Sequence, residues 1–131
     1  MERLFLAMIV GHFVGDYLLQ TRAMALRKSE RGRAGAGWCA LHCLIYAACV
    51  CLFAGRTDPL FAGSVFLSHW PIDRWSLAAK WLRLIRGRDV RQAFLSREPG
   101  RDIDLSFACL VYAAADNTMH AVLLWSIANL L

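Results

Sequence analysis

The sequence lacks three patterns that identify common classes of protein. Its five cysteines are an odd number and all lie in apolar segments, so we expect no disulfide framework. Neither a Gly-x-Ser-x-Gly elbow nor a phosphate-cradling glycine loop is present, which argues against serine-hydrolase and nucleotide-binding chemistry. An uninterrupted apolar stretch like that of a signal peptide is also missing, because His12 and Asp16 lie inside the first apolar run, so we expect that run to be retained as a membrane span.

The sequence is rich in apolar side chains and in positive charge. The chain has 131 residues, 58% of them hydrophobic, and a formal net charge of +5. It is too short for two globular domains and too apolar for an ordinary water-soluble one, so residues 1–131 are predicted to form a single transmembrane helical domain. The basic residues lie between apolar runs and not along one face, so the expected partner is a lipid bilayer with anionic headgroups, and no nucleic acid.

Four segments approach the roughly 20 apolar residues that a membrane-spanning helix needs. They cover residues 4–19, 37–54, 60–79 and 105–131. Helices are expected because every backbone group inside lipid must find a hydrogen-bond partner within its own segment. The fold class is therefore predicted to be all-α, a polytopic membrane protein with a four-helix transmembrane bundle.

The connections between these segments differ in charge. Twelve basic residues lie in the first and third connections, whereas only Arg3 and Arg56 lie on the opposite side. Positive loops stay in the cytoplasm, so we expect a multi-pass protein of the bacterial inner membrane with both termini outside. Residues 75–86 alternate apolar and basic side chains at helical spacing, which predicts a cytoplasmic amphipathic segment after span three, followed by a surface loop over residues 87–100.

All four histidines fall inside the predicted spans, and three of them have an aspartate four residues away. The pairs are His12 with Asp16, His69 with Asp73, and Asp116 with His120, and His42 stands alone. Residues four apart share one helix face, and ionisable groups facing lipid cost about 3 kcal/mol each, so these faces are expected to turn toward one another. Gln20, Tyr46 and Asn117 extend the same faces.

Imidazole and carboxylate groups together suit a divalent metal, zinc first, with manganese or iron as alternatives. The predicted metal ligands are His12, His42, His69, His120, Asp16, Asp73 and Asp116. The three aspartates are also the candidate catalytic residues, as ligands or general base. One ion or two bridged ions fit equally, and Arg74 is the one basic residue expected near the carboxylates, either neutralising Asp73 or reaching the headgroups.

These motifs resemble a known family. The sequence GHFVGDYLLQT at residues 11–21, Lys28-Ser29, Leu41-His42 with Ile45-Tyr46, SHWPID at residues 68–73, and Asp116 with His120 are similar to small bacterial and phage membrane proteins that are catalogued only as a domain of unknown function. Asn117 stands where that family usually has Gln. The resemblance covers nearly the whole chain and implies a shared intramembrane His/Asp cluster, but no established reaction.

Two functions follow as hypotheses. The first is a metal-dependent hydrolase of a lipid-soluble phosphoester or related substrate, with Arg74 contacting phosphate. The second is a non-enzymatic membrane subunit or a phage or envelope accessory protein, in which the cluster serves helix packing or the passage of protons or metal ions. A chain of 131 residues has little room for a transport path, so the second hypothesis needs a homo-oligomer or a larger membrane complex.

Overall fold

The computed structural model describes residues 2–87 and 89–131, and every regular element in that part of the chain is helical. The elements in order are α1 (Glu2–Phe13), a π-helical turn η1 (Val14–Leu18), α2 (Arg22–Arg27), α3 (Gly32–Ala54), α4 (Pro59–Arg74), α5 (Leu77–Arg86), α6 (Val90–Leu95) and α7 (Arg101–Leu130). The all-α prediction is therefore confirmed.

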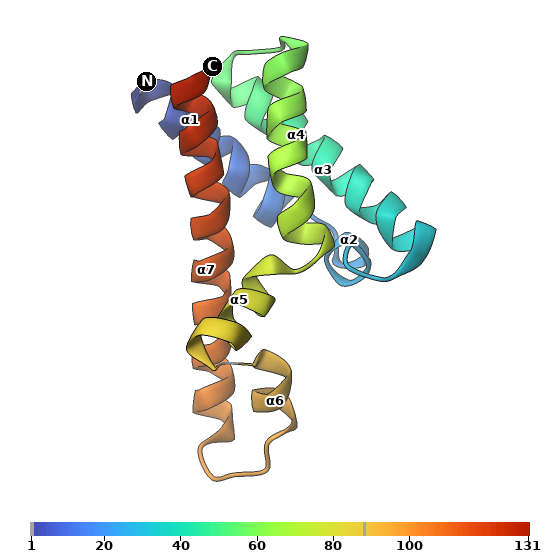
Figure 1. Cartoon of the computed structure of the whole chain (residues 1–131), viewed down its shortest axis with the longest axis vertical. Coiled ribbons are helices and arrows are strands. Elements are labelled where there is room, and N and C mark those ends of the chain that lie inside the picture. The colour runs from blue at the N-terminus through green and yellow to red at the C-terminus, as the bar shows by residue number, and fades with distance from the viewer. Residues whose placement is uncertain (1, 88) are drawn as a thin grey trace.

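Four helices pack in a ring. Helix α1 contacts α3, α3 contacts α4, α4 contacts α7, and α7 returns to α1. The two termini and the α3–α4 connection lie at one end of this bundle, and α5 and α6 cover the part of α7 that extends beyond the other end (Figure 1). The chain therefore divides along α7 into a four-helix region and a smaller α5–α6 region.

The helices begin and end at residues with clear local reasons. Asp58 caps α4, because its Oδ1 accepts a hydrogen bond from the backbone N–H of Phe61 at 3.0 Å. That hydrogen bond holds the pKa of Asp58 below its usual range. Pro59 occupies the first turn, where its missing N–H costs nothing. Helix α3 ends at Gly55, whose φ of 64° is readily adopted only by glycine.

Two glycines let α1 and η1 lie almost against the backbone of α3. A Cβ atom on Gly11 would meet the Cα of Val50 at 2.6 Å, and one on Gly15 would meet the Cα of Tyr46 at 3.1 Å. Small residues four apart on one helix are a known device for close helix packing. His12 and Asp16 directly follow these glycines, so the close approach carries both side chains toward α3.

The apolar core occupies the half of the bundle nearer the termini. Its largest fully buried members include Met8, Tyr46, Phe61, Val65 and Leu124. In α1, α4 and α7 the histidines lie to the side of this core that faces the α5–α6 region. Polar and apolar side chains are thus sorted along the bundle axis.

The structure corrects three predicted boundaries. The segment 60–79 is not one helix, because α4 ends at Arg74 and the chain turns at Ser76, a left-handed residue with φ 47°, before α5 begins. The segment 4–19 ends in the π-helical turn η1, and the segment 87–100 contains the short helix α6 where a loop was predicted. Asp89 explains α6, since its carboxylate caps the backbone N–H groups of Arg91 and Gln92.

Helix length supports two membrane spans. Within the described residues, α3 and α7 are long and apolar enough to cross a membrane. Helix α4 has 16 residues and α1 has 12, extended by the 5 residues of η1. Helices α1 and α4 are too short to pass this test, and a core helix of a water-soluble protein also passes it. Length and composition therefore do not establish the predicted four-span bundle.

Candidate metal centre

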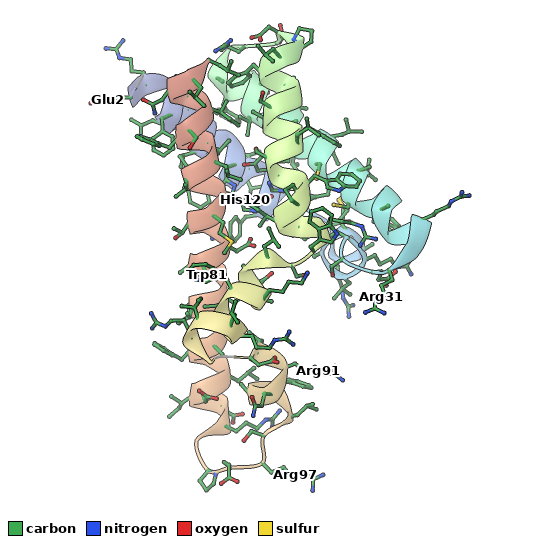
Figure 2. The ribbon with its side chains drawn as sticks, viewed as in Figure 1. Glu2, Arg31, Trp81, Arg91, Arg97 and His120 are labelled. Carbon is green, nitrogen blue, oxygen red and sulfur yellow. The ribbon has the colours of Figure 1, made fainter. Side chains whose placement is uncertain are left out.

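Each helix of the four-helix ring contributes a histidine to one buried cluster. His12 comes from α1, His42 from α3, His69 from α4 and His120 from α7, and each is at most 2% exposed. Figure 2 shows His120 in the interior of the bundle, with Arg31, Arg91 and Arg97 toward the opposite end from the termini. The fourfold convergence predicted from the sequence is therefore present.

Three ligand atoms form a compact triangle. His42 Nε2 lies 3.0 Å from His69 Nε2 and 3.2 Å from Asp16 Oδ1, and the third side, from His69 Nε2 to Asp16 Oδ1, is 3.5 Å. A tetrahedral zinc ion with bonds of about 2.0–2.1 Å separates its ligand atoms by about 3.3 Å. The triangle thus has the dimensions of one face of a zinc tetrahedron, and Asp73 Oδ2 lies beside two of its corners, 2.9 Å from His42 Nε2 and 3.1 Å from His69 Nε2.

A second group shares His69 with the first. His69, Asp73 and His120 also place one ligand atom each within 4.8 Å of one another. His69 Nε2 lies 3.1 Å from Asp73 Oδ2, and His120 Nε2 lies 3.9 Å from Asp73 Oδ1. The ring of His69 is stacked between Tyr46, at 3.6 Å between centroids, and His120, at 4.2 Å. This stack fixes the orientation of the one imidazole that both groups need.

Hydrogen bonding inside the protein leaves part of the cluster unsatisfied. Among the residues that the structure describes, four buried side-chain atoms have no hydrogen-bond partner, namely His12 Nδ1, His69 Nδ1, Asp16 Oδ1 and His120 Nε2. Asp16 belongs to the first ligand group and His120 to the second. A buried polar atom without a partner costs about 1–3 kcal/mol, and a bound cation removes this cost. The donor set therefore fits a divalent metal by its chemistry as well as by its spacing.

His12 lies beside the ligand groups and contacts the carboxylate of Asp16. Its Nδ1 lies 3.3 Å from Asp16 Oδ2, and its Nε2 lies 2.8 Å from Asn117 Oδ1. The Asn117 amide in turn donates to the hydroxyl of Tyr17 and to the carbonyl of Ala113. His12 belongs to neither ligand group. It lies where a residue that orients a ligating carboxylate is expected to lie.

Lys28 supplies the nearest fixed positive charge. Its Nζ donates to Asp73 Oδ2 at 2.7 Å, with 16% of the lysine side chain and 2% of the aspartate side chain exposed. Of the two alternatives left open for Arg74, neutralising Asp73 is not the one found, because the Arg74 guanidinium donates to the carbonyl of Gly32 at 3.4 Å. Lys28 reaches Asp73 because α2 folds back beneath α3, with which it is in contact.

The formal charges of the cluster would be balanced by a divalent cation. Asp16, Asp73 and Asp116 carry three negative charges and Lys28 carries one positive charge, so the difference is −2 with the histidines neutral. A divalent ion would bring the cluster to neutrality, which is the condition under which charges are least costly to bury.

Asp116 lies at the edge of the cluster. Its Oδ2 is 3.7 Å from His120 Nε2, its side chain is 23% exposed, and it belongs to neither ligand group. Gln20 lies at another edge, with its Nε2 3.0 Å from His42 Nε2. Five of the seven predicted ligands thus belong to the two groups, and His12 and Asp116 lie beside them.

Sequence reasoning missed Lys28, Gly11 and Gly15 as parts of the centre. Lys28 was counted only as a loop charge, although it belongs to the motif that carries the family resemblance. The signal for the glycines is their spacing of four residues within an apolar helix, with His12 and Asp16 one position further on.

The comparisons with known proteins identify a family without a known activity. No curated protein and no solved structure matches the chain. The family described as "Protein of unknown function (DUF3307)" matches residues 4–129. Because that match covers almost all of the 131 residues, the chain belongs to the DUF3307 family.

Proposed function

We propose that this protein is a four-span membrane protein that holds a divalent metal, zinc by preference, and uses it to hydrolyse a lipid-soluble phosphate ester. The observation that carries the proposal is the triangle of Asp16 Oδ1, His42 Nε2 and His69 Nε2. Three protein ligands with an open fourth position are typical of catalytic zinc, whereas structural zinc has four.

The distribution of side chains supports a membrane location for all four helices. Their buried interior holds the four histidines, while leucines on the outside are largely exposed, at 63% for Leu6 in α1, 76% for Leu52 in α3, 68% for Leu67 in α4 and 69% for Leu110 in α7. In a water-soluble bundle the exposed faces of the helices are mostly polar. The short helices α1 and α4 would cross with little tilt or in a thinned bilayer.

The groups of the cluster divide into distinct roles in the proposed reaction. A divalent ion would polarise the substrate and a water molecule. Hydrolysis joins the water oxygen to phosphorus and breaks the ester P–O bond, with one water proton passing to the leaving alcohol. Asp116 lies outside both ligand groups and is partly exposed, so it is placed to accept the proton from water and deliver it.

One observation favours the non-enzymatic alternative. Lys28 already gives Asp73 a cation at 2.7 Å, and His12, Asn117 and Tyr17 form a hydrogen-bonded chain between α1, η1 and α7. Such contacts suit a cluster that fixes helix packing. They leave Asp16 Oδ1 and His120 Nε2 without partners, which is why the metal proposal accounts for more of the cluster.

The first experiment measures metal in the detergent-purified protein by elemental analysis. The wild type is expected to hold at least one equivalent of zinc, and His42→Ala and His69→Ala are expected to lose it. Tyr46→Phe is the matched control, because it keeps the ring stacked on His69 and removes no ligand atom. A wild type that holds no zinc, manganese or iron after incubation with each would refute the metal centre.

The second experiment tests the reaction. The purified protein with zinc is expected to release inorganic phosphate or a phosphate ester from detergent-dispersed phospholipid. Asp116→Asn should lower the rate while leaving the metal content unchanged, because Asp116 is not one of the grouped ligands. Full activity in His69→Ala would show that any release comes from a contaminant.

A further inference from the structure

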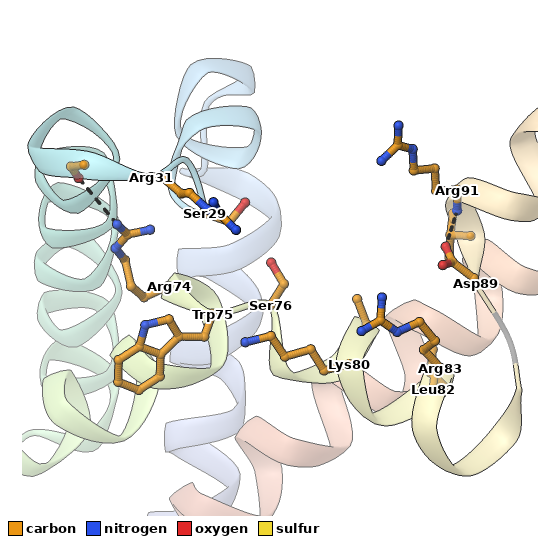
Figure 3. Close-up of a pocket in the computed structure, with 13 residues that line it drawn as sticks. Ser29, Arg31, Arg74, Trp75, Ser76, Lys80, Leu82, Arg83, Asp89 and Arg91 are labelled. Atoms are coloured by element: carbon orange, nitrogen blue, oxygen red, sulfur yellow. Dashed lines mark hydrogen bonds between the residues drawn. The ribbon is translucent and has the colours of Figure 1, made fainter.

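A cavity of about 700 Å³ lies between the start of α3, the end of α4, α5 and the start of α6. Figure 3 shows its lining, with Arg74 and Trp75 on one side and Arg83, Asp89 and Arg91 on the other. Ser29 and Arg74 belong to this lining, and their chain neighbours Lys28 and Asp73 form the ion pair of the cluster. Two residues of the lining are thus chain neighbours of the Lys28–Asp73 pair, which does not itself line the cavity.

The cavity is strongly basic. Its lining includes five cationic side chains, namely Arg31, Arg74, Lys80, Arg83 and Arg91. Within residues 2–87 and 89–131, none of them forms an ion pair with a carboxylate. The one acidic lining residue, Asp89, already caps the backbone of α6. Guanidinium groups bind phosphate through paired hydrogen bonds, so this lining suits a phosphate group.

Local backbone geometry supports a binding role. Ser76 lines the cavity and has φ 47° and ψ 54°, a left-handed conformation that is costly for a residue with a side chain. This turn separates α4 from α5 and opens the space between Arg74 and Lys80. The hydroxyls of Ser76 and Ser29 add neutral hydrogen-bond donors to the cationic lining.

Helix α5 separates this cavity from an apolar groove. Lys80 and Arg83 line the basic cavity, whereas Leu77 and Trp81 line a groove of about 510 Å³ against α7. The groove also includes Met119 and Val122 and lies next to the cluster through Ile72. A charged cavity and an apolar groove on two faces of one helix match the two ends of a membrane lipid.

We propose that the basic cavity binds the phosphate headgroup of a membrane phospholipid while the apolar groove between α5 and α7 holds part of its acyl chain. This assignment names the substrate class of the proposed hydrolase and rests on that function for its catalytic meaning, but the binding itself requires only the cationic lining. A headgroup bound there would lie next to Ser29 and Arg74, the chain neighbours of the Lys28–Asp73 pair.

The test is lipid binding by detergent-purified, delipidated protein, read by native mass spectrometry. The probes are phosphatidic acid, diacylglycerol with the same chains, and glycerol 3-phosphate. Phosphatidic acid is expected to bind about tenfold more tightly than diacylglycerol, because several charge-assisted hydrogen bonds depend on the phosphate. Arg74→Gln with Arg83→Gln should abolish this preference, and Arg97→Gln, an exposed arginine outside the cavity, should keep it.

Three outcomes would overturn the proposal. They are equal binding of phosphatidic acid and diacylglycerol, an unchanged preference in the double variant, and competition by glycerol 3-phosphate at the same concentration as the lipid, which would assign the cavity to a soluble phosphate. If the double variant does not fold, Lys80→Gln on the exposed side of α5 replaces it. Zinc content is measured in parallel, so a protein that prefers phosphatidic acid but holds no metal would overturn the proposed function and leave the lipid site standing.

Discussion

Lys28 and Asp73 join two segments that are 45 residues apart in the chain, with the ammonium nitrogen 2.7 Å from the carboxylate oxygen. The pair links the end of α2 to the end of α4 beneath the histidine cluster. Its two residues are also the chain neighbours of Ser29 and Arg74, which line the basic cavity.

Replacing Lys28 by Met should weaken the metal-free protein and strengthen its binding of zinc. The metal-free form should lose about 1–3 kcal/mol, because Asp73 is left buried without its cation. Zinc should then raise the melting temperature of the variant by more than that of the wild type, since the cluster carries one more uncompensated negative charge. Lys80→Met is the control on an exposed lysine. Equal zinc responses in Lys28→Met and wild type would show that no metal binds beside Asp73.

Replacing Gly11 by Ala should separate α1 from α3. The added methyl would lie 2.6 Å from the Cα of Val50, so the helices must move apart at a cost of about 1–3 kcal/mol. Gly63→Ala is a matched control within α4, because its methyl meets no atom within 4 Å, and it should leave stability unchanged or raise it by about 0.5 kcal/mol. Denaturant titration in detergent measures both variants, and equal midpoints would contradict the close packing.

Replacing Asn117 by Leu should weaken metal binding without removing it. His12 would lose its 2.8 Å contact and orient Asp16 less firmly, and loss of such outer contacts lowers metal affinity by about 10–100-fold. Competition with a zinc chelator gives the affinity. Asn129→Leu, whose amide contacts only the carbonyl of Trp125, is the control. A variant that loses all bound zinc at saturation would instead make Asn117 part of the ligand set.

The membrane topology can be tested with fusions. Both termini are predicted outside, so a reporter active only in the periplasm should work after Leu131, while the same reporter inserted after Pro99 should be silent. A reporter that works only in the cytoplasm should give the reverse pattern. Activity of the cytoplasmic reporter after Leu131 would contradict the orientation. It would also contradict the count of four spans if a reporter at the N-terminus worked only in the periplasm, because an even number of spans places both termini on one side.

The sequence predicted the parts of the centre that depend on local periodicity. His12 with Asp16, and His69 with Asp73, share helix faces because residues four apart always do, and the cost of burying them requires those faces to meet. The Lys28 contact could not be predicted in this way, because it depends on the path of the chain between α1 and α3. A flexible lysine side chain in a charged connection resembles any other loop charge until that path is known.

The residues at which helices begin and end were harder to predict, because they also depend on contacts between distant parts of the chain. The polar run Asp73-Arg74-Trp75-Ser76 interrupts the apolar segment 60–79, but a polar run does not by itself specify a left-handed turn. The space that this turn opens depends on α3 and α6, which are distant in sequence. For Arg74 the sequence left two alternatives open, Asp73 or the headgroups, and gave no sign of its contact with the carbonyl of Gly32.

The length of α7 sets the level at which the basic cavity lies. A helix of 30 residues is about 45 Å long, whereas the hydrocarbon layer is about 30 Å thick. In the four-span arrangement that we propose, about ten residues at the start of α7 therefore stand clear of the hydrocarbon, and α5 and α6 pack on this projecting part. In this arrangement the length of α7 keeps the α5–α6 region at the depth of the lipid phosphates. Deleting one turn of α7 would move that region into the layer of acyl chains.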